Sequence, residues 1–179
     1  MLDHRMPPRD ACVVRDLIDK HAQQVGQRTF CVLADGEEWT YAALQAQVRD
    51  CAEALQRLGV RQGDFVLAWL PNGADCLRVM FALNYLGAVY VPINTGYRGG
   101  LLEHVIDNSG ANLMIADAQL VDRLRDVKHA ALKTVVVVGG AAPAVPGLVM
   151  RDASVLRGHG GALQPPEREI QPWDTLCVI

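Results

Sequence analysis

The sequence of 179 residues contains no long hydrophobic run, although half of its residues are hydrophobic. No apolar stretch, the run at 86–93 included, approaches the roughly 20 residues that a membrane-spanning helix needs. The amino-terminal residues MLDHRMPPRDA carry early positive charges but no apolar core, so they do not form a secretory signal. These absences argue against a membrane span and favour a cytoplasmic protein.

The charges and the cysteines exclude further classes of protein. The formal net charge is −3 and no basic stripe is present, so nucleic acid is not an expected partner. The five cysteines, at positions 12, 31, 51, 76 and 177, show no C-x-x-C spacing and are odd in number. We therefore expect free, mostly buried thiols in a reducing cytoplasm, and we expect no metal site.

Motifs that carry common chemistries are also missing. The sequence has no G-x-x-x-x-G-K-[ST], G-x-G-x-x-G, H-E-x-x-H or G-x-S-x-G segment. The nearest approach to a glycine-rich loop, Gly158-His159-Gly160-Gly161, is followed by neither a hydroxyl side chain nor a lysine, and we interpret it as a flexible connector. A lone histidine, His104, is expected to be half-buried in a helix rather than catalytic. The sequence therefore identifies no catalytic residue.

Alternation of apolar strands and amphipathic helices is the clearest pattern that is present. Strands are predicted near 65–70, 89–93, 113–116 and 135–138, and helices at 13–25, 41–58, 72–87 and 99–109. A strand–helix–strand unit implies a parallel connection. We therefore predict an α/β fold: a doubly wound, mainly parallel sheet with helices on both faces. A tight-turn signal between two β-rich runs adds a small hairpin near 29–41.

Several helix ends can be assigned from capping residues. We expect Asn72 to be the N-cap of one helix, with Asp75 in its first turn, and Gly87 to end that helix in the left-handed conformation. Thr40 is expected to cap the helix that follows the hairpin. Asp117 is expected to cap a further helix, whose apolar positions are Leu120, Val121, Leu124 and Val127.

The composition changes in the carboxyl-terminal part of the chain. Residues 139–147 and 158–172 are rich in glycine, proline and polar residues and are predicted to be loops, with a short strand and a helical turn between them. The last segment, WDTLCVI (173–179), has the pattern of a strand that begins and is not completed. We therefore interpret residues 1–179 as a single incomplete α/β domain. Its uncovered apolar surface would favour homo-oligomers or aggregation.

Several ordered segments resemble the adenylate-forming acyl-CoA synthetases, the AMP-binding ligases. The segment DGEEWTYAAL (35–44) matches the family's D/N-G-x-x-x-T-Y-x-x-L pattern, and the stretch from LPNG to GAVYVPIN (70–94) is similar to its strand–helix–strand core. The variant NTGYRGGLLEH (94–104) looks most like carnitine- or betaine-CoA ligases. The resemblance covers roughly residues 16–179. It implies that the chain is the N-terminal part of the large domain of such a ligase.

The resemblance also implies a reaction and its cofactors. The family activates a carboxylic acid with ATP and Mg²⁺ to an acyl-adenylate and then transfers the acyl group to CoA. Its Ser/Thr/Gly-rich phosphate loop, with a lysine, follows a strand similar to 173–179, and its adenine-binding motifs and catalytic lysine come later. None of these is present in the 179 residues. We therefore expect no ligase activity and no tight cofactor binding from them alone, and the sequence does not identify the acid.

Arg98 is the one candidate cofactor-binding residue. It lies where a predicted parallel strand gives way to the next helix, and ligands of open α/β sheets gather at the carboxyl ends of strands. The resemblance associates an arginine in this region with a CoA phosphate. A solvated Arg98, or one paired with Glu103, is the simpler alternative. Asn94 and Tyr97 flank it, and either line the same edge or only shape the loop.

Two other interpretations remain open. One is the front part of a peptide-synthetase-type adenylation domain, whose strand and helix segments are similar. The other is a non-catalytic α/β binding or interaction module without nucleotide chemistry. A Ser/Thr/Gly-rich loop with a lysine in the coding DNA beyond Ile179 would distinguish a ligase from such a module.

Overall fold

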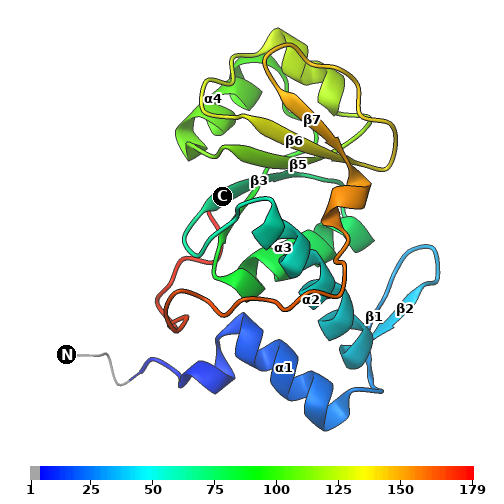
Figure 1. Cartoon of the computed structure of the whole chain (residues 1–179), viewed down its shortest axis with the longest axis vertical. Helices are drawn as coiled ribbons and strands as arrows, with labels where there is room; N and C mark the ends of the chain where they lie inside the picture. Colours follow the sequence, from blue (N-terminus) through cyan, green and yellow to red (C-terminus); the bar gives the residue numbers. More distant parts are fainter. Residues whose placement is uncertain (1–4) are drawn as a thin grey trace.

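A parallel β-sheet forms the centre of the computed structural model, which describes residues 5–179 (Figure 1). Five strands pair in the order β4-β3-β5-β6-β7, and each of these pairings is parallel. The strands are β3 (Phe65–Trp69), β4 (Val89–Pro92), β5 (Leu113–Asp117), β6 (Thr134–Val138) and β7 (Val149–Asp152). The predicted α/β class with a mainly parallel sheet is therefore confirmed.

The strands are apolar on both sides because both faces of the sheet are covered. In β3, Val66 and Ala68 belong to one buried cluster, whereas Leu67 and Trp69 belong to another. Successive side chains of a strand point to opposite faces, so the two clusters are the two faces of the sheet. This arrangement explains why the strand sequences lack the polar alternation of a half-exposed sheet.

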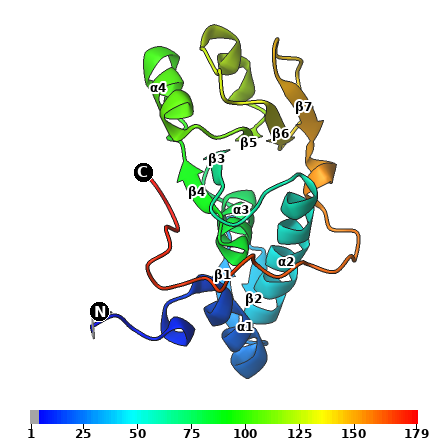
Figure 2. The ribbon, with the colours of Figure 1, turned by 60° about the vertical axis from the view of Figure 1, so that its left-hand side comes forward.

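Helices cover the two faces in separate layers (Figures 1 and 2). On one face lie α2 (Tyr41–Arg57) and α3 (Ala74–Leu86), with α1 (Val14–Val25) packed against them. On the other face lie α4 (Gly99–Ser109) and the short 3-10 helix η2 (Val121–Asp126). The doubly wound arrangement predicted from the sequence is therefore confirmed.

A small antiparallel hairpin precedes α2, as predicted. Its strands are β1 (Thr29–Val32) and β2 (Glu38–Thr40). Thr40 is the N-cap of α2, because its Oγ1 accepts a hydrogen bond from the backbone N–H of Ala43 at 3.2 Å. Trp39 is 1% exposed and belongs to the core cluster under α2 and α3. The hairpin is thus attached to the domain by an aromatic anchor.

The expected N-cap of α3 is wrong by one residue. The helix begins at Ala74 with Gly73 as its N-cap, and the carbonyl of Gly73 accepts the first helical hydrogen bond, from Leu77 at 3.1 Å. Asn72 consequently lies outside the cap, although Asp75 remains in the first turn. Gly87 ends the helix in the left-handed conformation as predicted, with φ of 74°.

The helix expected after Asp117 is a 3-10 helix of six residues rather than an α-helix. Its predicted apolar positions are all buried, so the pattern located the inward face correctly. An ion pair between Asp122 and Arg125, three residues apart at 3.3 Å, suits the three-residue turn. Asp117 ends β5, and its Oδ1 accepts from the N–H of Gln119 at 2.8 Å, which forms a side-chain turn rather than an α-helical cap.

The carboxyl-terminal part contains little regular structure. Residues 139–147 and 158–172 form neither helix nor strand, and β7 and the 3-10 helix η3 (Ala153–Leu156) lie between them. The segment 173–179 then joins the sheet through one parallel bridge, between Tyr90 and Cys177. In Figure 2 this red segment runs along the side of the molecule where β4 forms the edge of the sheet.

The cysteines are less buried than expected. All five are free, but only Cys51 is buried, and Cys177 is exposed. Burial raises the pKa of the Cys51 thiol to about 12, so this thiol is unreactive at neutral pH. The expectation of mostly buried thiols is wrong, because Cys31 and Cys76 are only partly buried against the core, Cys12 is partly exposed before α1, and Cys177 lies in the terminal segment.

Candidate functional site

The carboxyl ends of the parallel strands share one edge of the sheet, which is where open α/β folds bind ligands. The loop after β3 leads into α3, and the loop after β4 reaches α4 through Arg98. β6 ends at the same edge, next to Gly139. Because these loops come from separate parts of the chain, this edge is the candidate site.

Arg98 is exposed at this edge and is the N-cap residue of α4, where its side chain makes no capping hydrogen bond. Glu103, the expected alternative partner, pairs with Lys128 instead. The Nζ of Lys128 lies 3.6 Å from Oε1 of Glu103, and its backbone N–H donates to Oε2 at 3.0 Å. Within residues 5–179, Arg98 forms no ion pair with a carboxylate. Its guanidinium is therefore open to an anion.

A second arginine, Arg123 of η2, lies beside the same loop. Its Nη1 donates to the carbonyl of Thr95 at 2.6 Å and to that of Tyr97 at 3.3 Å, and its Cζ lies 5.6 Å from the ring centroid of Trp69. Burial, and then the positive charge of Arg98, lower the pKa of Arg123. The two guanidiniums therefore concentrate positive charge at the end of β4. The sequence did not single out Arg123, because no spacing signal joins η2 to this loop.

Asn94 and Tyr97 shape the loop. Oδ1 of Asn94 accepts from the N–H of Gly96 at 2.8 Å, and its carbonyl accepts from Nε1 of Trp69 at 3.2 Å. The N–H of Tyr97 donates to the carbonyl of Asn94 at 3.0 Å, and the ring of Tyr97 packs, partly buried, against the core under α4. Both residues have a structural role that holds the Arg98 loop in place.

A cavity of about 470 Å³ opens at the carboxyl edge on the α3 side of the sheet, and Asp75, Arg78 and Gly139 are among its lining residues. Arg78 donates to Oδ1 of Asp75 at 2.5 Å and to Oε1 of Gln47 at 3.0 and 3.2 Å. Its Cζ also lies 5.7 Å from the ring of Trp39. Because Asp75 and Arg78 satisfy each other, they offer neither a free base nor a free anion-binding group.

The glycine-rich connector lies against negative charge. A Cβ added at Gly161 would lie 2.8 Å from Oε1 of Glu53, and one added at Gly158 would collide with the carboxylate of Asp50. The N–H of His159 donates to Oε1 of Glu53 at 3.4 Å. The backbone of this segment therefore packs directly on carboxylates of α2. Carboxylates repel phosphate, so this segment does not form a phosphate cradle.

His104 is exposed rather than half-buried, which corrects the expectation. α4 buries Leu102 and Ile106, and position 104 lies on the opposite side of the helix. Residues 5–179 contain no group of three His, Cys, Asp or Glu side chains that could hold a metal ion. None of the helices in this described range has the length and apolar character needed to cross a lipid bilayer.

The terminal segment lies along β4 and points toward the candidate edge. The N–H of Tyr90 donates to the carbonyl of Leu176 at 3.0 Å, and the N–H of Val178 donates to the carbonyl of Tyr90 at 3.1 Å. Because the bridge is parallel, the segment runs in the same direction as β4. It therefore advances toward the edge at which Arg98 lies.

Comparison with known proteins decides the family. The profile described as AMP-binding enzyme matches residues 18–179. The chain belongs to the AMP-binding enzyme family. The resemblance seen in segments 35–44 and 70–94 is thereby confirmed.

Named relatives that this chain matches are CoA ligases. It is 35% identical over 103 residues to 4-coumarate–CoA ligase 4 of Arabidopsis thaliana, a match that covers 56% of this chain and 18% of that protein. It is 28% identical over 120 residues to the crotonobetaine/carnitine–CoA ligase of Salmonella paratyphi A, covering 65% of this chain and 23% of that protein. The chain thus spans about a fifth of the length of the curated relatives that it matches.

Solved structures agree with this chain in fold. A long-chain-fatty-acid–CoA ligase from Archaeoglobus fulgidus superposes with a TM-score of 0.76 at 24% identity, over 92% of this chain and 33% of that chain. The N-terminal domain of FACL13 from Mycobacterium tuberculosis superposes with a TM-score of 0.69 at 22% identity, over 93% of this chain and 40% of that chain. The α/β arrangement is therefore that of the N-terminal region of such ligases.

Proposed function

We propose that these residues form the N-terminal part of an acid–CoA ligase, which uses ATP to activate a carboxylic acid as an acyl-adenylate and then transfers the acyl group to CoA. The family match over residues 18–179 carries the proposal, because its named relatives are CoA ligases. The parallel pairing of residues 176–178 with β4 supports the proposal. The family resemblance implies that a strand similar to 173–179 precedes the phosphate loop.

Within the proposed reaction, these residues are the scaffold. The connector at 158–161 faces carboxylates, which repel phosphate, and the described residues include no group of three His, Cys, Asp or Glu side chains for Mg²⁺. ATP and Mg²⁺ would be held by residues of the ligase other than these. Positioning and electrostatics provide most of such catalysis, so we expect the 179 residues alone to have no ligase activity.

CoA is the one cofactor for which these residues provide a group. Arg98 is exposed and has no carboxylate partner within residues 5–179, and Arg123 adds a second positive charge beside it. An exposed guanidinium can bind a phosphate through two parallel hydrogen bonds. We assign Arg98 to a CoA phosphate contact, which salt would weaken because the site is exposed to solvent. The five free cysteines suit a reducing cytoplasm, where we place the reaction.

The proposal is tested with the product of the whole reading frame that encodes these residues. The enzyme is given ATP, Mg²⁺, CoA and a panel of acids that includes 4-coumarate, crotonobetaine, carnitine and long-chain fatty acids. Mass spectrometry should detect AMP and an acyl-CoA thioester that depend on one of the acids. Hydroxylamine replaces CoA in a parallel reaction to trap the adenylate as a hydroxamate.

The outcomes separate the alternatives. Arg98→Ala should weaken thioester formation at low CoA while hydroxamate formation is unchanged, and Arg125→Ala serves as a control, since Arg125 pairs with Asp122 on the surface. AMP release without transfer to CoA would indicate an adenylation domain of the peptide-synthetase type. Neither AMP nor hydroxamate with any acid would contradict the proposal and favour a non-catalytic module.

A further inference from the structure

The loop between β4 and α4, residues 94–98, carries Arg98 and contains little that would fix its shape by itself. Gly96 lies within the loop, and Gly99 and Gly100 follow Arg98 directly. A Cβ added at Gly99 or Gly100 would meet nothing within 4 Å, so neither position is closely packed. Glycine loses more backbone freedom on folding than any other residue. The position of Arg98 therefore depends on contacts that other parts of the chain make with this loop.

Arg123 of η2 provides two of these contacts. Its Nη1 donates to the carbonyl of Thr95 at 2.6 Å and to that of Tyr97 at 3.3 Å, and the bond to Thr95 is the stronger of the two. The carbonyl of Tyr97 belongs to the peptide group that joins Tyr97 to Arg98, and a peptide group is planar. Arg123 therefore restrains the plane from which the backbone of Arg98 begins.

The guanidinium of Arg123 is itself held by Trp69 at the end of β3. Its Cζ lies 5.6 Å from the centroid of this ring, and Trp69 is fully buried. An arginine over an aromatic face is attracted by the ring and keeps its N–H groups available for hydrogen bonds. Nε1 of the same indole donates to the carbonyl of Asn94 at 3.2 Å. Trp69 and Arg123 thus form one support that binds the loop at residues 94, 95 and 97.

Arg98 is held by this support but is not itself used in it. Within residues 5–179, its side chain makes neither a capping hydrogen bond nor an ion pair with a carboxylate. Burial, and then the charge of Arg98, lower the pKa of Arg123, so the two like charges repel each other. The bonds to Thr95 and Tyr97 hold the loop in place against this repulsion. Arg98 is therefore kept exposed beside Arg123 without a structural role of its own.

We infer that Arg123 is a positioning residue for CoA binding: its hydrogen bonds to the loop before Arg98 hold the Arg98 guanidinium at the carboxyl edge of the sheet, where Arg98 binds a CoA phosphate. This inference rests on the proposed function. Arg123 acts through the carbonyls of Thr95 and Tyr97 and does not itself touch CoA. Arg123 should consequently affect CoA binding only as long as Arg98 is present.

The size of the effect follows from the fraction of molecules in which the loop is correctly placed. Loss of a hydrogen bond to a charged group changes an equilibrium constant by about tenfold to a hundredfold. The apparent affinity for a ligand falls in proportion to the fraction of molecules that can bind it. Arg123→Met keeps the apolar stem but cannot donate, so we expect it to raise the KM for CoA about tenfold. Arg123→Lys keeps one charged donor group and should raise this KM less.

Amide hydrogen exchange in the 179-residue chain measures the loop without any reaction. The N–H of Tyr97 donates to the carbonyl of Asn94 at 3.0 Å, which closes the turn directly before Arg98. R123M should increase exchange at Tyr97 about tenfold. The amide of Ala118, which donates to the carbonyl of Val138 at 2.9 Å, should be unchanged and reports on the sheet.

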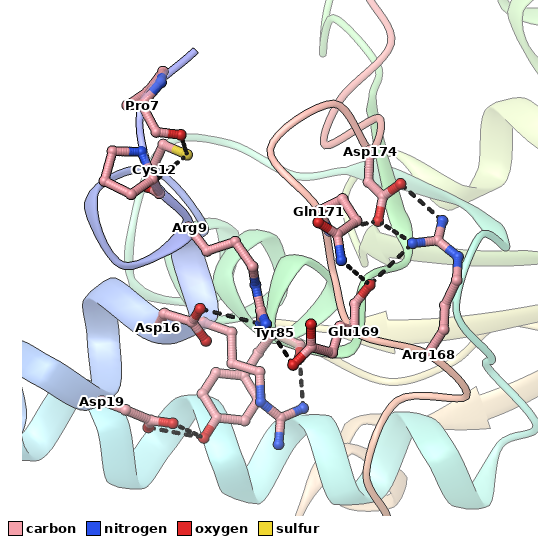
Figure 3. A network of polar contacts seen from close by, with 12 residues as sticks. Pro7, Arg9, Cys12, Asp16, Asp19, Tyr85, Arg168, Glu169, Gln171 and Asp174 are labelled. Atoms are coloured by element: carbon pink, nitrogen blue, oxygen red, sulfur yellow. Dashed lines mark hydrogen bonds and ion pairs between the residues drawn. The ribbon is translucent and has the colours of Figure 1, made fainter. Parts of the chain in front are cut away.

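Two further arginines provide matched controls. Arg125→Met makes the same substitution in η2, at a residue that pairs with Asp122. Arg168→Met removes hydrogen bonds elsewhere in the chain, where Nη1 and Nη2 of Arg168 donate to the carboxylate oxygens of Asp174, each at 2.7 Å (Figure 3). Neither control should change exchange at Tyr97. Unchanged exchange at Tyr97 in R123M would overturn the inference, and so would an equal increase at Ala118, since that result indicates a general loss of stability.

The enzyme from the whole reading frame gives the second readout, as a double-mutant cycle on the KM for CoA. R123M should raise this KM in the wild-type background but change it by less than about twofold in the R98A background. R123M should leave unchanged both kcat at saturating CoA and hydroxamate formation, which does not use CoA.

The outcomes of the cycle separate the inference from the proposed function. A wild-type KM in either R98A or R123M would overturn the inference alone. Increases that multiply in the double variant would also overturn it, because they would mean that Arg123 binds CoA directly. Absence of thioester formation in the wild-type enzyme would overturn the proposed function and this inference with it, even if the amide exchange results were as expected.

Discussion

Gly87 ends α3 next to Ile170, which lies in the loop at 158–172 before the terminal segment, and Gly87→Ala tests this contact. Gly87 has φ of 74°, and a Cβ added there would lie 3.0 Å from Cγ of Gln62 and 3.1 Å from Cγ1 of Ile170. Gly110 ends α4 with φ of 62°, but a Cβ added there meets nothing within 4 Å. The two glycines therefore share the backbone conformation and differ in crowding.

The comparison isolates the steric cost at residue 87. Placing alanine in the left-handed conformation costs about 1–2 kcal/mol, and this amount is common to Gly87→Ala and Gly110→Ala. Ile170 is almost fully buried and cannot move away without disturbing its own packing. Overpacking of this kind costs typically about 1–3 kcal/mol. We expect Gly87→Ala to lower the free energy of unfolding by about 1–3 kcal/mol more than Gly110→Ala.

The free energy of unfolding of both variants is measured by urea denaturation, followed by circular dichroism. A double-mutant cycle with Ile170→Ala is measured in the same way. Ile170→Ala removes Cγ1, so Gly87→Ala should cost less in that background than in the wild type, by about 1 kcal/mol. Equal effects of Gly87→Ala and Gly110→Ala, or strict additivity with Ile170→Ala, would refute the contact between the end of α3 and Ile170.

Three further predictions follow from individual contacts. Thr40→Ala removes the acceptor for the N–H of Ala43 and should lower the free energy of unfolding by about 1 kcal/mol in urea, whereas Thr175→Ala, at an exposed position, should have little effect. The hydrogen bond from Arg168 holds the pKa of Asp174 below its usual value, so its contribution to stability is fully present above the unfolded-state pKa of about 3.9 and is lost as the pH falls through the lower folded-state pKa. The stability difference between wild type and Asp174→Asn should accordingly be constant at neutral pH and shrink below about pH 4. Sedimentation velocity should show association of the 179-residue chain at high concentration, since Phe65, Trp173 and Ile179 are exposed, and a clean monomer would contradict the predicted association.

The strands and most helices could be predicted because their signals are local. Four strands buried on both faces are continuous apolar runs, and α4 was predicted with the ends that the structure has. Thr40 and Gly87 also cap the predicted helices, because a cap depends on neighbouring backbone groups. The N-cap of α3 is Gly73 rather than the predicted Asn72. Both residue types are found at N-caps, and the first helical hydrogen bond, from Leu77 to the carbonyl of Gly73, identifies which of the two is the cap.

The site could be predicted only in part, because its contacts join distant segments. The position of Arg98 at a strand end was visible in the sequence, but its charged neighbour Arg123 comes from η2. For His104 the sequence predicted partial burial, whereas α4 packs through Leu102 and Ile106 and leaves His104 exposed.

The central claim is that these residues are the scaffold of an AMP-forming ligase whose phosphate chemistry comes from other residues of the enzyme. ATP–pyrophosphate exchange tests it most directly, with the purified 179-residue chain and the whole-reading-frame enzyme assayed side by side on the same acids. We predict exchange from the whole enzyme that depends on one acid, and none above a buffer blank from the 179 residues. Exchange by the 179 residues alone would contradict the account, because it would require a phosphate site among them.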